Sequence, residues 1–393
     1  MATRYLVSGG TGDYNSTTNW SATSGGASGA SFPTSVDDII IDFNSANANI
    51  TVNVLSACKS FNASNYTGTW TISNDFSVNG TTNTGNITLS SGMTITGSAS
   101  FIKVPTSTTG VITSNGAIFD CNFIFQAAAA TTTTITGAMQ VNKNITWSLN
   151  SSSINTINSG TISVGGDIIH NSPVAGTSPL QMIGSTTATI TQFATRFLQT
   201  NLIINKTGIL NINDLNWGAG SRTLTYTAGI VNHTGILYTA SASILSTSGM
   251  IWNTIRPSAS FLDFTSICYA NKIEQIGATQ IEFRGTFGFN VNIYSMIGTN
   301  GGSVTFKSDI VYVINNSITQ SSDTSNLSFF RCSGVNNAIV NLGSNAFTKL
   351  HLVSITKITA SNKTLRTANG TVDANSKNCF KLDSNINPYS TTR

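Results

Sequence analysis

The chain has 393 residues and a net charge of +4, and only 9% of its residues are charged. A typical globular domain has about 25%. Thr, Ser, Asn and Gly replace the missing charge, while Ile, Val and Phe recur throughout, which argues against a disordered chain. The 19 basic residues are scattered and form no stripe, so no binding to nucleic acid is expected. This composition favours strands over helices.

The first 45 residues differ from the rest of the chain and are predicted to form an N-terminal cap. They combine Trp20 with a loose stretch rich in Gly and Ser. A solenoid needs its open end covered, and terminal repeats are atypical for that reason. The chain does not open with a basic segment followed by an apolar stretch, so no signal peptide is expected. No run approaches the roughly 20 apolar residues of a membrane span, so no membrane insertion is expected.

The only acidic cluster of the sequence lies near the end of this segment, at Asp37, Asp38 and Asp42. Three carboxylates so close in sequence could form a calcium site or contain a catalytic pair. The alternative is a turn followed by a strand whose acidic residues face outward. We favour the second interpretation, and we therefore expect neither a metal nor another cofactor.

From residue 46 to residue 345 the sequence repeats a short pattern. Gly68–Gly80 aligns without gaps on Gly85–Gly97. The pattern is G-x-Φ-x-Φ-x-x-[D/N/G]-Φ-x-Φ, where Φ is apolar. It returns at Gly137 and again at Gly160. Each Φ-x-Φ places two side chains on one face of a short strand.

The polar position between the two strands of the pattern is predicted to be a corner, because Asp, Asn and Gly tolerate turn dihedrals and can bond their own backbone. The predicted corner residues are Asp75, Asn144, Asp167, Asp214 and Asp309. Strand, corner, strand and loop, repeated about every 17–23 residues, describe one coil of a right-handed parallel β-helix. Such coils bury their apolar faces by stacking on one another.

An antiparallel β-sandwich is the alternative all-β fold. It predicts strands of about five or more residues joined by two-residue turns such as Asn79-Gly80 and Asn115-Gly116. Most strands expected here are shorter, which favours the β-helix.

Residues 346–393 are expected to add coils and a polar tail. The five cysteines form no C-x-x-C pair, and we expect buried thiols in the core.

The opening of the chain carries a resemblance to a known family. It reads G-x-[Y/W], then W, then P-T-S-x-D-D-Φ-Φ-Φ-D, then Cys58-Lys-Ser-Phe-Asn, and then the stacked coils. This order resembles the β-helix virion proteins of tailed bacteriophages, which include tail-fibre and tailspike-like structural proteins. The likeness covers the first 120 residues best and the region from Arg222 to Trp252 moderately.

The resemblance implies a virion location, with synthesis in the host cytoplasm and no signal peptide. It implies a homotrimer that contacts other virion proteins and attaches to a host surface glycan. Similar openings occur in bacterial surface adhesins. A bacterial surface adhesin and a capsid decoration protein are therefore alternatives to the fibre or spike.

Some phage β-helices cleave polysaccharides, which makes a depolymerase on the same scaffold a further alternative. Glycoside hydrolysis needs two carboxylates about 5–9.5 Å apart, and adjacent coils stack about 4.8 Å apart. The region of Asp263 and Glu282 is the only one where acidic residues occur at coil spacing. They could instead form a solvated ladder or pair with Lys272 and Arg284. We favour a non-catalytic protein because the corners already assign several carboxylates to structure.

Four aromatic residues are candidates for stacking on sugar rings, namely Trp217, Tyr226, Tyr238 and Trp252. A tryptophan at a Φ position is, however, more often a core residue. No GxSxG, phosphate-binding or HExxH motif is present.

Overall fold

The computed structural model confirms the predicted all-β fold, a parallel β-solenoid with about 62% strand. It describes residues 2–45, 47–80, 85–105, 109–126, 130–148, 154–193, 197–218, 221–240, 243–257, 261–276, 280–297, 303–321, 328–333, 337–342, 347–351, 353–356, 358–361, 365–368, 371–372, 374, 376 and 379–382. No α-helix occurs in these ranges. In the same ranges, no helix has the length and apolar character needed to cross a membrane.

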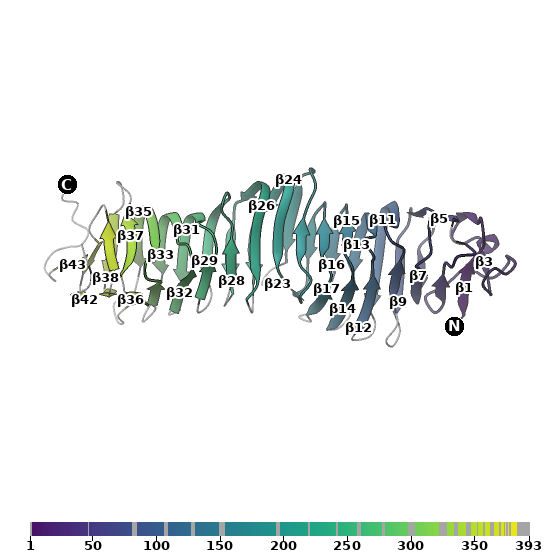
Figure 1. Ribbon diagram of the computed structural model, residues 1–393, viewed down its shortest axis with the longest axis horizontal. Coiled ribbons are helices and arrows are strands. Elements are labelled where there is room, and N and C mark those ends of the chain that lie inside the picture. Colours follow the sequence, from purple (N-terminus) through teal and green to yellow (C-terminus); the bar gives the residue numbers. More distant parts are fainter. Residues whose placement is uncertain are drawn as a thin grey trace. The chain divides into compact units, whose positions relative to one another are not determined.

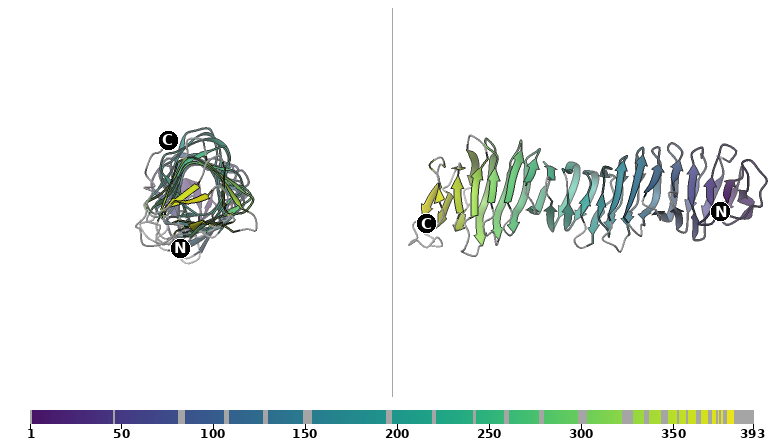
Figure 2. Two further views of the ribbon diagram at one scale, coloured as in Figure 1. Left: turned by 90° about the vertical axis from the view of Figure 1, so that its left-hand side faces the viewer. Right: turned by 90° about the horizontal axis from the view of Figure 1, so that it is seen from below.

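The chain divides into two compact units. The first unit contains Met1–Asn211 and Ala228–Ile230, and the second contains Ile212–Thr227 and Val231–Arg393. This division does not coincide with the boundaries predicted after residues 45 and 345. Figures 1 and 2 show the strands of each unit lying side by side in successive coils.

A coil of the first unit contributes one strand to a first sheet and two strands, or one long strand, to a second sheet. In one coil these are β7 (Ser60–Ala63), β8 (Trp70–Ile72) and β9 (Phe76–Gly80). In the next coil β10 (Ile87–Leu89) pairs parallel with β7, and β11 (Thr94–Pro105) pairs parallel with both β8 and β9. Figure 1 shows β7, β9 and β11 in this order along the solenoid.

Later coils of the first unit continue this order. Their strands are β12 (Thr109–Thr113), β13 (Ile118–Phe125), β14 (Thr131–Thr136), β15 (Met139–Val141), β16 (Ile145–Trp147), β17 (Asn155–Ser159), β18 (Ile162–Val164), β19 (Ile168–His170), β20 (Val174–Ala175), β21 (Leu180–Met182), β22 (Ala188–Gln192), β23 (Leu198–Gln199) and β24 (Leu202–Ile212). The pairings from β12 to β23 that the structure gives are all parallel, as expected for a β-helix.

The N-terminal segment is paired into the same two sheets. Its elements are β1 (Thr3–Leu6), β2 (Thr11–Asp13), the short 3-10 helix η1 (Thr17–Asn19), β3 (Trp20–Ser21) and β4 (Asp38–Ile40), and β5 (Asn49–Val52) and β6 (Ser56–Cys58) follow it. β1 pairs antiparallel with β3 and parallel with β4. Trp20 is fully buried, and its Nε1 donates to the Tyr14 carbonyl at 2.7 Å. A capping role for this segment stays a prediction.

The second unit contains the remaining strands. They are β25 (Leu215–Trp217), β26 (Thr223–His233), β27 (Ile236–Thr239), β28 (Ser243–Ser246), β29 (Ile251–Pro257), β30 (Phe261–Phe264), β31 (Cys268–Ile276), β32 (Gln280–Gly285), β33 (Phe289–Ile297), β34 (Ser303–Phe306), β35 (Val311–Ser321), β36 (Ser328–Cys332), β37 (Ala338–Leu342), β38 (Phe347–His351), β39 (Val353–Thr356), β40 (Ile358–Ser361), β41 (Leu365–Ala368), β42 (Thr371–Val372) and β43 (Cys379–Leu382). Its core includes the mutually packed rings of Phe283, Phe289, Phe306 and Tyr312.

The length of a coil varies more than the sequence pattern predicts. Thr71 lies opposite Thr96, 25 residues later, and Tyr238 lies opposite Arg256, 18 residues later. The repeat that starts at Gly160 does follow the one at Gly137 by a whole coil, because β15 pairs with β18.

The first alignment of the sequence pattern does not correspond to one coil of the solenoid. The match of Gly68–Gly80 with Gly85–Gly97 places β8 on β10, which belong to different sheets. The two strands follow the same short apolar alternation, so the pattern alone cannot separate them.

Corner side chains hold successive coils together. The Asp75 Oδ1 accepts from the Ser100 backbone N–H at 2.9 Å, 25 residues further along the chain. The same arrangement joins Asn144 to the Asp167 N–H, Asp167 to the Thr189 N–H and Asp214 to the Ile236 N–H, each at 2.8 Å. Asp309 takes a left-handed turn conformation with φ of 62°. These bonds leave the corner carboxylates in a structural role.

Close contact between coils explains the glycine that opens the repeat. A Cβ on Gly160 would lie 1.9 Å from the carbonyl oxygen of Gly137 in the preceding coil. Only glycine permits such an approach of two backbones.

Lysine side chains bond glycine carbonyls of earlier coils. In the first unit, the Nζ of Lys143 donates to Gly97 and that of Lys206 donates to Gly165, both at 2.7 Å. Lys103, which is fully buried, donates to the Gly85 carbonyl, 18 residues back and within one coil length.

Candidate functional site

The three N-terminal aspartates have separate partners. Asp37 accepts from the Ala2 N–H at 2.8 Å and from the Thr34 N–H at 3.1 Å. Burial raises the pKa of Asp37, but the hydrogen bonds from Thr34 and Ala2 outweigh it and hold that pKa below its ordinary value. The side chain of Asp37 therefore closes a turn just before β4, from a buried position.

Asp38 and Asp42 are also engaged locally. Asp38 pairs with Lys59 at 3.4 Å, and Asp42 accepts from the Ser24 hydroxyl at 2.5 Å and from the Asn44 N–H at 2.9 Å. No group of three or more metal-binding side chains occurs in the part of the chain that the structure describes.

The predicted carboxylate pair lies on one outward face of the second unit. Asp263 is on β30 and Glu282 on the neighbouring β32, where Asp263 is opposite Arg284 and Phe261 is opposite Glu282. The two acidic residues are therefore diagonal neighbours, about 8 Å apart at their backbones from strand spacing and rise. On either side of Asp263, Leu262 and Phe264 point into the core and are fully buried. The structure thus brings together the two acids singled out from the sequence.

Arg284 organises this face. Its Nη2 donates to the Glu282 Oε2 at 2.7 Å, and its guanidinium lies 4.1 Å from the centre of the Phe261 ring. A cation over an aromatic face at this distance is an attractive contact. Lys307, just after β34, borders the face and donates to the Gly285 carbonyl at 2.7 Å.

Asp263 is the unusual carboxylate of this face. Its Oδ1 is buried and has no hydrogen-bond partner among the described residues. Burial raises its pKa, the nearby Glu282 raises it further, and Arg284 and Lys307 counteract both only in part. Asp263 therefore holds a proton more readily than an exposed aspartate, while Glu282 is bonded to Arg284.

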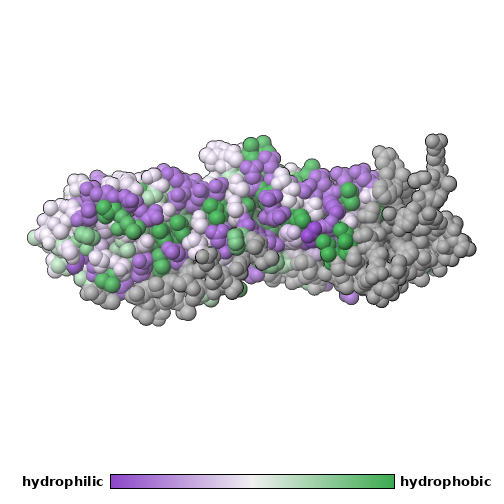
Figure 3. All heavy atoms as spheres, turned by 180° about the vertical axis from the view of Figure 1, so that it is seen from behind, coloured by the Kyte–Doolittle hydropathy of each residue, from purple (hydrophilic) through white to green (hydrophobic). Residues whose placement is uncertain are grey.

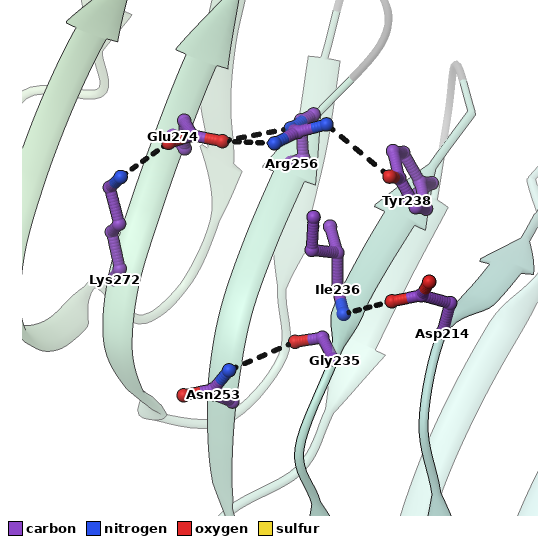
Figure 4. Close-up of polar contacts among 8 residues, drawn as sticks. All are labelled: Asp214, Gly235, Ile236, Tyr238, Asn253, Arg256, Lys272 and Glu274. Carbon is purple, nitrogen blue, oxygen red and sulfur yellow. Dashed lines mark hydrogen bonds and ion pairs between the residues drawn. The ribbon is translucent and has the colours of Figure 1, made fainter.

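A second charged cluster in the same unit is closed upon itself. Figure 4 shows Arg256 between Tyr238 and Glu274, with Lys272 on the other side of Glu274. Arg256 donates to the Tyr238 hydroxyl at 3.3 Å, lies 5.2 Å from the ring centre, and forms an ion pair with Glu274. Lys272 forms a second ion pair with Glu274, whose side chain is only 8% exposed. Both cations and the carboxylate are therefore satisfied within the protein.

Two of the predicted sugar-stacking residues are corrected by the structure. Trp217 and Trp252 are fully buried, so neither can stack on a sugar at the surface. The Φ positions of these strands face the core. Burying a large aromatic ring there is more favourable than leaving it in water. Tyr238 is half-buried with Arg256 over its ring, and Tyr226 is half-buried.

Sequence reasoning missed that arginines cover two partly exposed rings, those of Tyr238 and Phe261. A signal was present in the spacing, because Tyr238, Arg256 and Glu274 follow one another at intervals of 18 residues. That interval is the local coil length, so the three side chains stack directly across β27, β29 and β31.

The cysteines are as expected. Cys58, Cys121, Cys268, Cys332 and Cys379 are free and buried, which confirms the prediction of buried thiols.

The surface of the molecule mixes polar and apolar side chains. Figure 3 shows hydrophilic and hydrophobic residues interspersed over the visible face, without one dominant apolar region. Large apolar side chains such as Phe193, Ile230 and Ile251 are exposed at separate places along the chain. Single exposed apolar residues of this kind are ordinary and do not define a binding site.

Comparison with known proteins identifies no relative. No family model, no curated protein and no solved structure matches the chain significantly. Function must therefore be argued from the residues of the fold and of the face formed by Phe261, Asp263, Glu282, Arg284 and Lys307, called the Asp263 face below.

Proposed function

We propose that this chain is a virion fibre or spike protein that attaches to a surface glycan without cleaving it. The observation that carries the proposal is the Asp263 face. It sets the carboxylates of Asp263 and Glu282 on one outward face, beside donors that have hydrogens to spare on Arg284 and Lys307. A sugar presents hydroxyl groups that both donate and accept, so it fits a surface of mixed polarity.

The charge balance of the Asp263 face favours a hydroxyl-rich ligand over an ion. Arg284 is paired with Glu282, and Lys307 lies near Asp263, so two positive charges stand against two negative ones. A free cation would meet Arg284 and Lys307, and a free anion would meet the two carboxylates.

The rest of the proposal follows from the resemblance in the opening of the chain. A homotrimer, contacts with other virion proteins and a virion location remain part of it. Sedimentation of the purified full chain tests the trimer, and a monomer at all concentrations would contradict it.

Glycan binding is tested with the full chain and purified capsular polysaccharide or lipopolysaccharide in a surface-binding assay. We expect binding without new reducing ends, and weaker binding by Asp263→Asn. Asp120→Asn is the matched control, because Asp120 is also an outward strand residue and accepts from Asn142 at 3.4 Å in the first unit. Equal binding by wild type and Asp263→Asn would contradict the assignment of the Asp263 face.

A polysaccharide depolymerase is the second candidate, and one observation favours it. Asp263 has a raised pKa beside Glu282, which is bonded to Arg284, and two carboxyls in unlike environments are the arrangement expected of an acid and a base. Diagonal neighbours on adjacent strands are near enough for their carboxyl groups to act on the same glycosidic bond. New reducing ends that disappear in both Asp263→Asn and Glu282→Gln would establish this activity in place of simple attachment.

A further inference from the structure

A column of inward side chains runs through the second sheet of the first unit. Lys103, Phe125, Trp147 and His170 occupy the same position on successive coils, each opposite the next. Neighbouring members are therefore about 4.8 Å apart along the column. The Trp147 ring stacks on Phe125 at 5.5 Å between centres and 7° between planes, which fixes the orientation of the indole.

The last two members of this column carry polar atoms that no described residue satisfies. His170 is fully buried, and neither its Nδ1 nor its Nε2 has a hydrogen-bond partner among the described residues. The same holds for the Nε1 of Trp147, the residue directly opposite. A neutral imidazole has one donor and one acceptor, and an indole has one donor. Burying such groups without partners opposes folding, so they call for a partner of matching polarity.

A chain of buried hydrogen bonds ends beside His170. The Thr131 hydroxyl donates to the Asn155 Oδ1 at 3.1 Å, and the Asn155 Nδ2 donates to the Ser172 Oγ at 2.9 Å. Ser172 follows His170 after one intervening residue and is fully buried. Because its oxygen accepts from Asn155, its own hydroxyl hydrogen remains to be donated. Burial lowers the pKa of His170 to about 4. The Ser172 backbone lies near the ring without meeting hydrogen-bond geometry and counteracts this shift only in part, so the ring is neutral at pH 7.

We propose that Trp147, His170 and Ser172 form a buried water-binding site in the core of the first unit. Water both donates and accepts, and buried waters make two to four bonds to polar groups of this kind. The three residues offer two donors in Trp147 and Ser172, and both a donor and an acceptor in His170. A metal ion does not fit, because an indole N–H is no ligand and His170 belongs to no metal-binding cluster in the described ranges. An apolar ligand would leave the same bonds unmade.

The site joins two coils and the corner between the sheets. Trp147 ends β16, His170 ends β19 in the next coil, and Ser172 lies in the turn that leads to β20. A water bound to all three holds this turn to both strands through bonds that no described side chain supplies. The inference is independent of the proposed function.

Nuclear magnetic resonance of the full chain with ¹⁵N-labelled tryptophan tests the site directly. We expect a water cross-peak of long residence at the Trp147 indole N–H and its loss in His170→Leu. Trp20 is the internal control, because its Nε1 donates to a protein carbonyl at 2.7 Å. A Trp147 indole with no water contact in the wild type would overturn the proposal.

Thermal unfolding gives a second, independent reading. If His170 is bonded to water, replacing it by leucine removes satisfied bonds, and the melting temperature stays the same or falls. If the ring is dry and unpartnered, leucine relieves the burial of two polar atoms and the melting temperature rises. A rise would contradict the proposal even where the spectrum is ambiguous.

Discussion

Lys103 in the first unit and Glu274 in the second are both buried charges, but they are compensated differently. Glu274 lies between two cations, Arg256 and Lys272, while Lys103 stands in an apolar column and donates to one backbone carbonyl. Burial raises the pKa of Glu274, but its bonds to Lys272 and Arg256 hold that pKa below its ordinary value. Burial lowers the pKa of Lys103 to about 8. A buried charge is thus stabilised in one unit and only tolerated in the other.

The largest effect is expected from removing the charge of Glu274. Glu274→Gln leaves Arg256 and Lys272 side by side without their shared partner, and breaking a buried ion pair costs about 3–5 kcal/mol. The cations are 26% and 31% exposed, which places the expected loss near the lower value. Denaturant unfolding at pH 7 measures it. An unchanged free energy of unfolding would mean that the two ion pairs do not stabilise Glu274, and the difference from Lys103 would not hold.

The pH dependence of the first unit should reveal a second buried titratable group, His170. Because the pKa of His170 is about 4 in the folded chain and 6.5 in its ordinary state, the unfolded chain binds a proton between these values and the folded chain does not. Stability therefore falls by about 3 kcal/mol as the pH drops from 6.5 to 4. Unfolding curves of wild type and His170→Leu should diverge in that window, and parallel curves would show that His170 is not the group responsible.

A gain of stability is expected where a charge is merely tolerated. Lys103 carries a penalty of about 3 kcal/mol below pH 8, and that penalty vanishes as the pH rises to 10.5. Lys103→Met removes the penalty but leaves the Gly85 carbonyl without its donor, at a cost of about 1 kcal/mol. We expect a net gain of about 2 kcal/mol at pH 7 that shrinks above pH 8. A loss at pH 7 would mean that the Gly85 bond stabilises more than burial of the charge destabilises.

The smallest effect is expected at the Asp263 face. Arg284 is 46% exposed and Glu282 is 30% exposed, so their ion pair is screened by water. Glu282→Gln should lower the free energy of unfolding by less than about 1 kcal/mol. The same denaturant measurement as for Glu274→Gln makes this the matched control, since both substitutions remove one glutamate charge from an arginine. Equal losses for the two glutamates would show that burial does not separate them.

The coil architecture could be predicted from the sequence because alternation and corner residues are local properties. Asp75 and Asp167 lie at corners, where turn geometry favours Asp, Asn or Gly. The residues on either side are enough to recognise such a corner in the sequence. The coil boundaries could not be predicted, because strands of both sheets share one apolar alternation. β8 and β10 look alike as sequence and lie in different sheets.

The candidate site could be predicted only in part. The spacing of Asp263 and Glu282 indicated adjacent coils, and they lie on adjacent strands. Whether a ring at a Φ position faces the core or the solvent depends on the strand that carries it. The prediction that Trp252 stacks on a sugar at the surface was therefore wrong, because its ring is fully buried. The buried Lys103 breaks the apolar pattern at an inward position, and its bond partner is a backbone carbonyl, which no sequence pattern identifies.

The corner bonds give the first unit a direction. Asn144 supports Asp167, and Asp167 supports Thr189, so each side chain braces the backbone of the coil that follows it. Each of these bonds needs one side chain per coil, and its partner lies in the adjacent coil. Such a ladder can be lengthened or shortened by whole coils through duplication or loss of a segment, because the residue newly placed after the junction meets the same acceptor. The corner bonds therefore set no limit of their own on the number of coils.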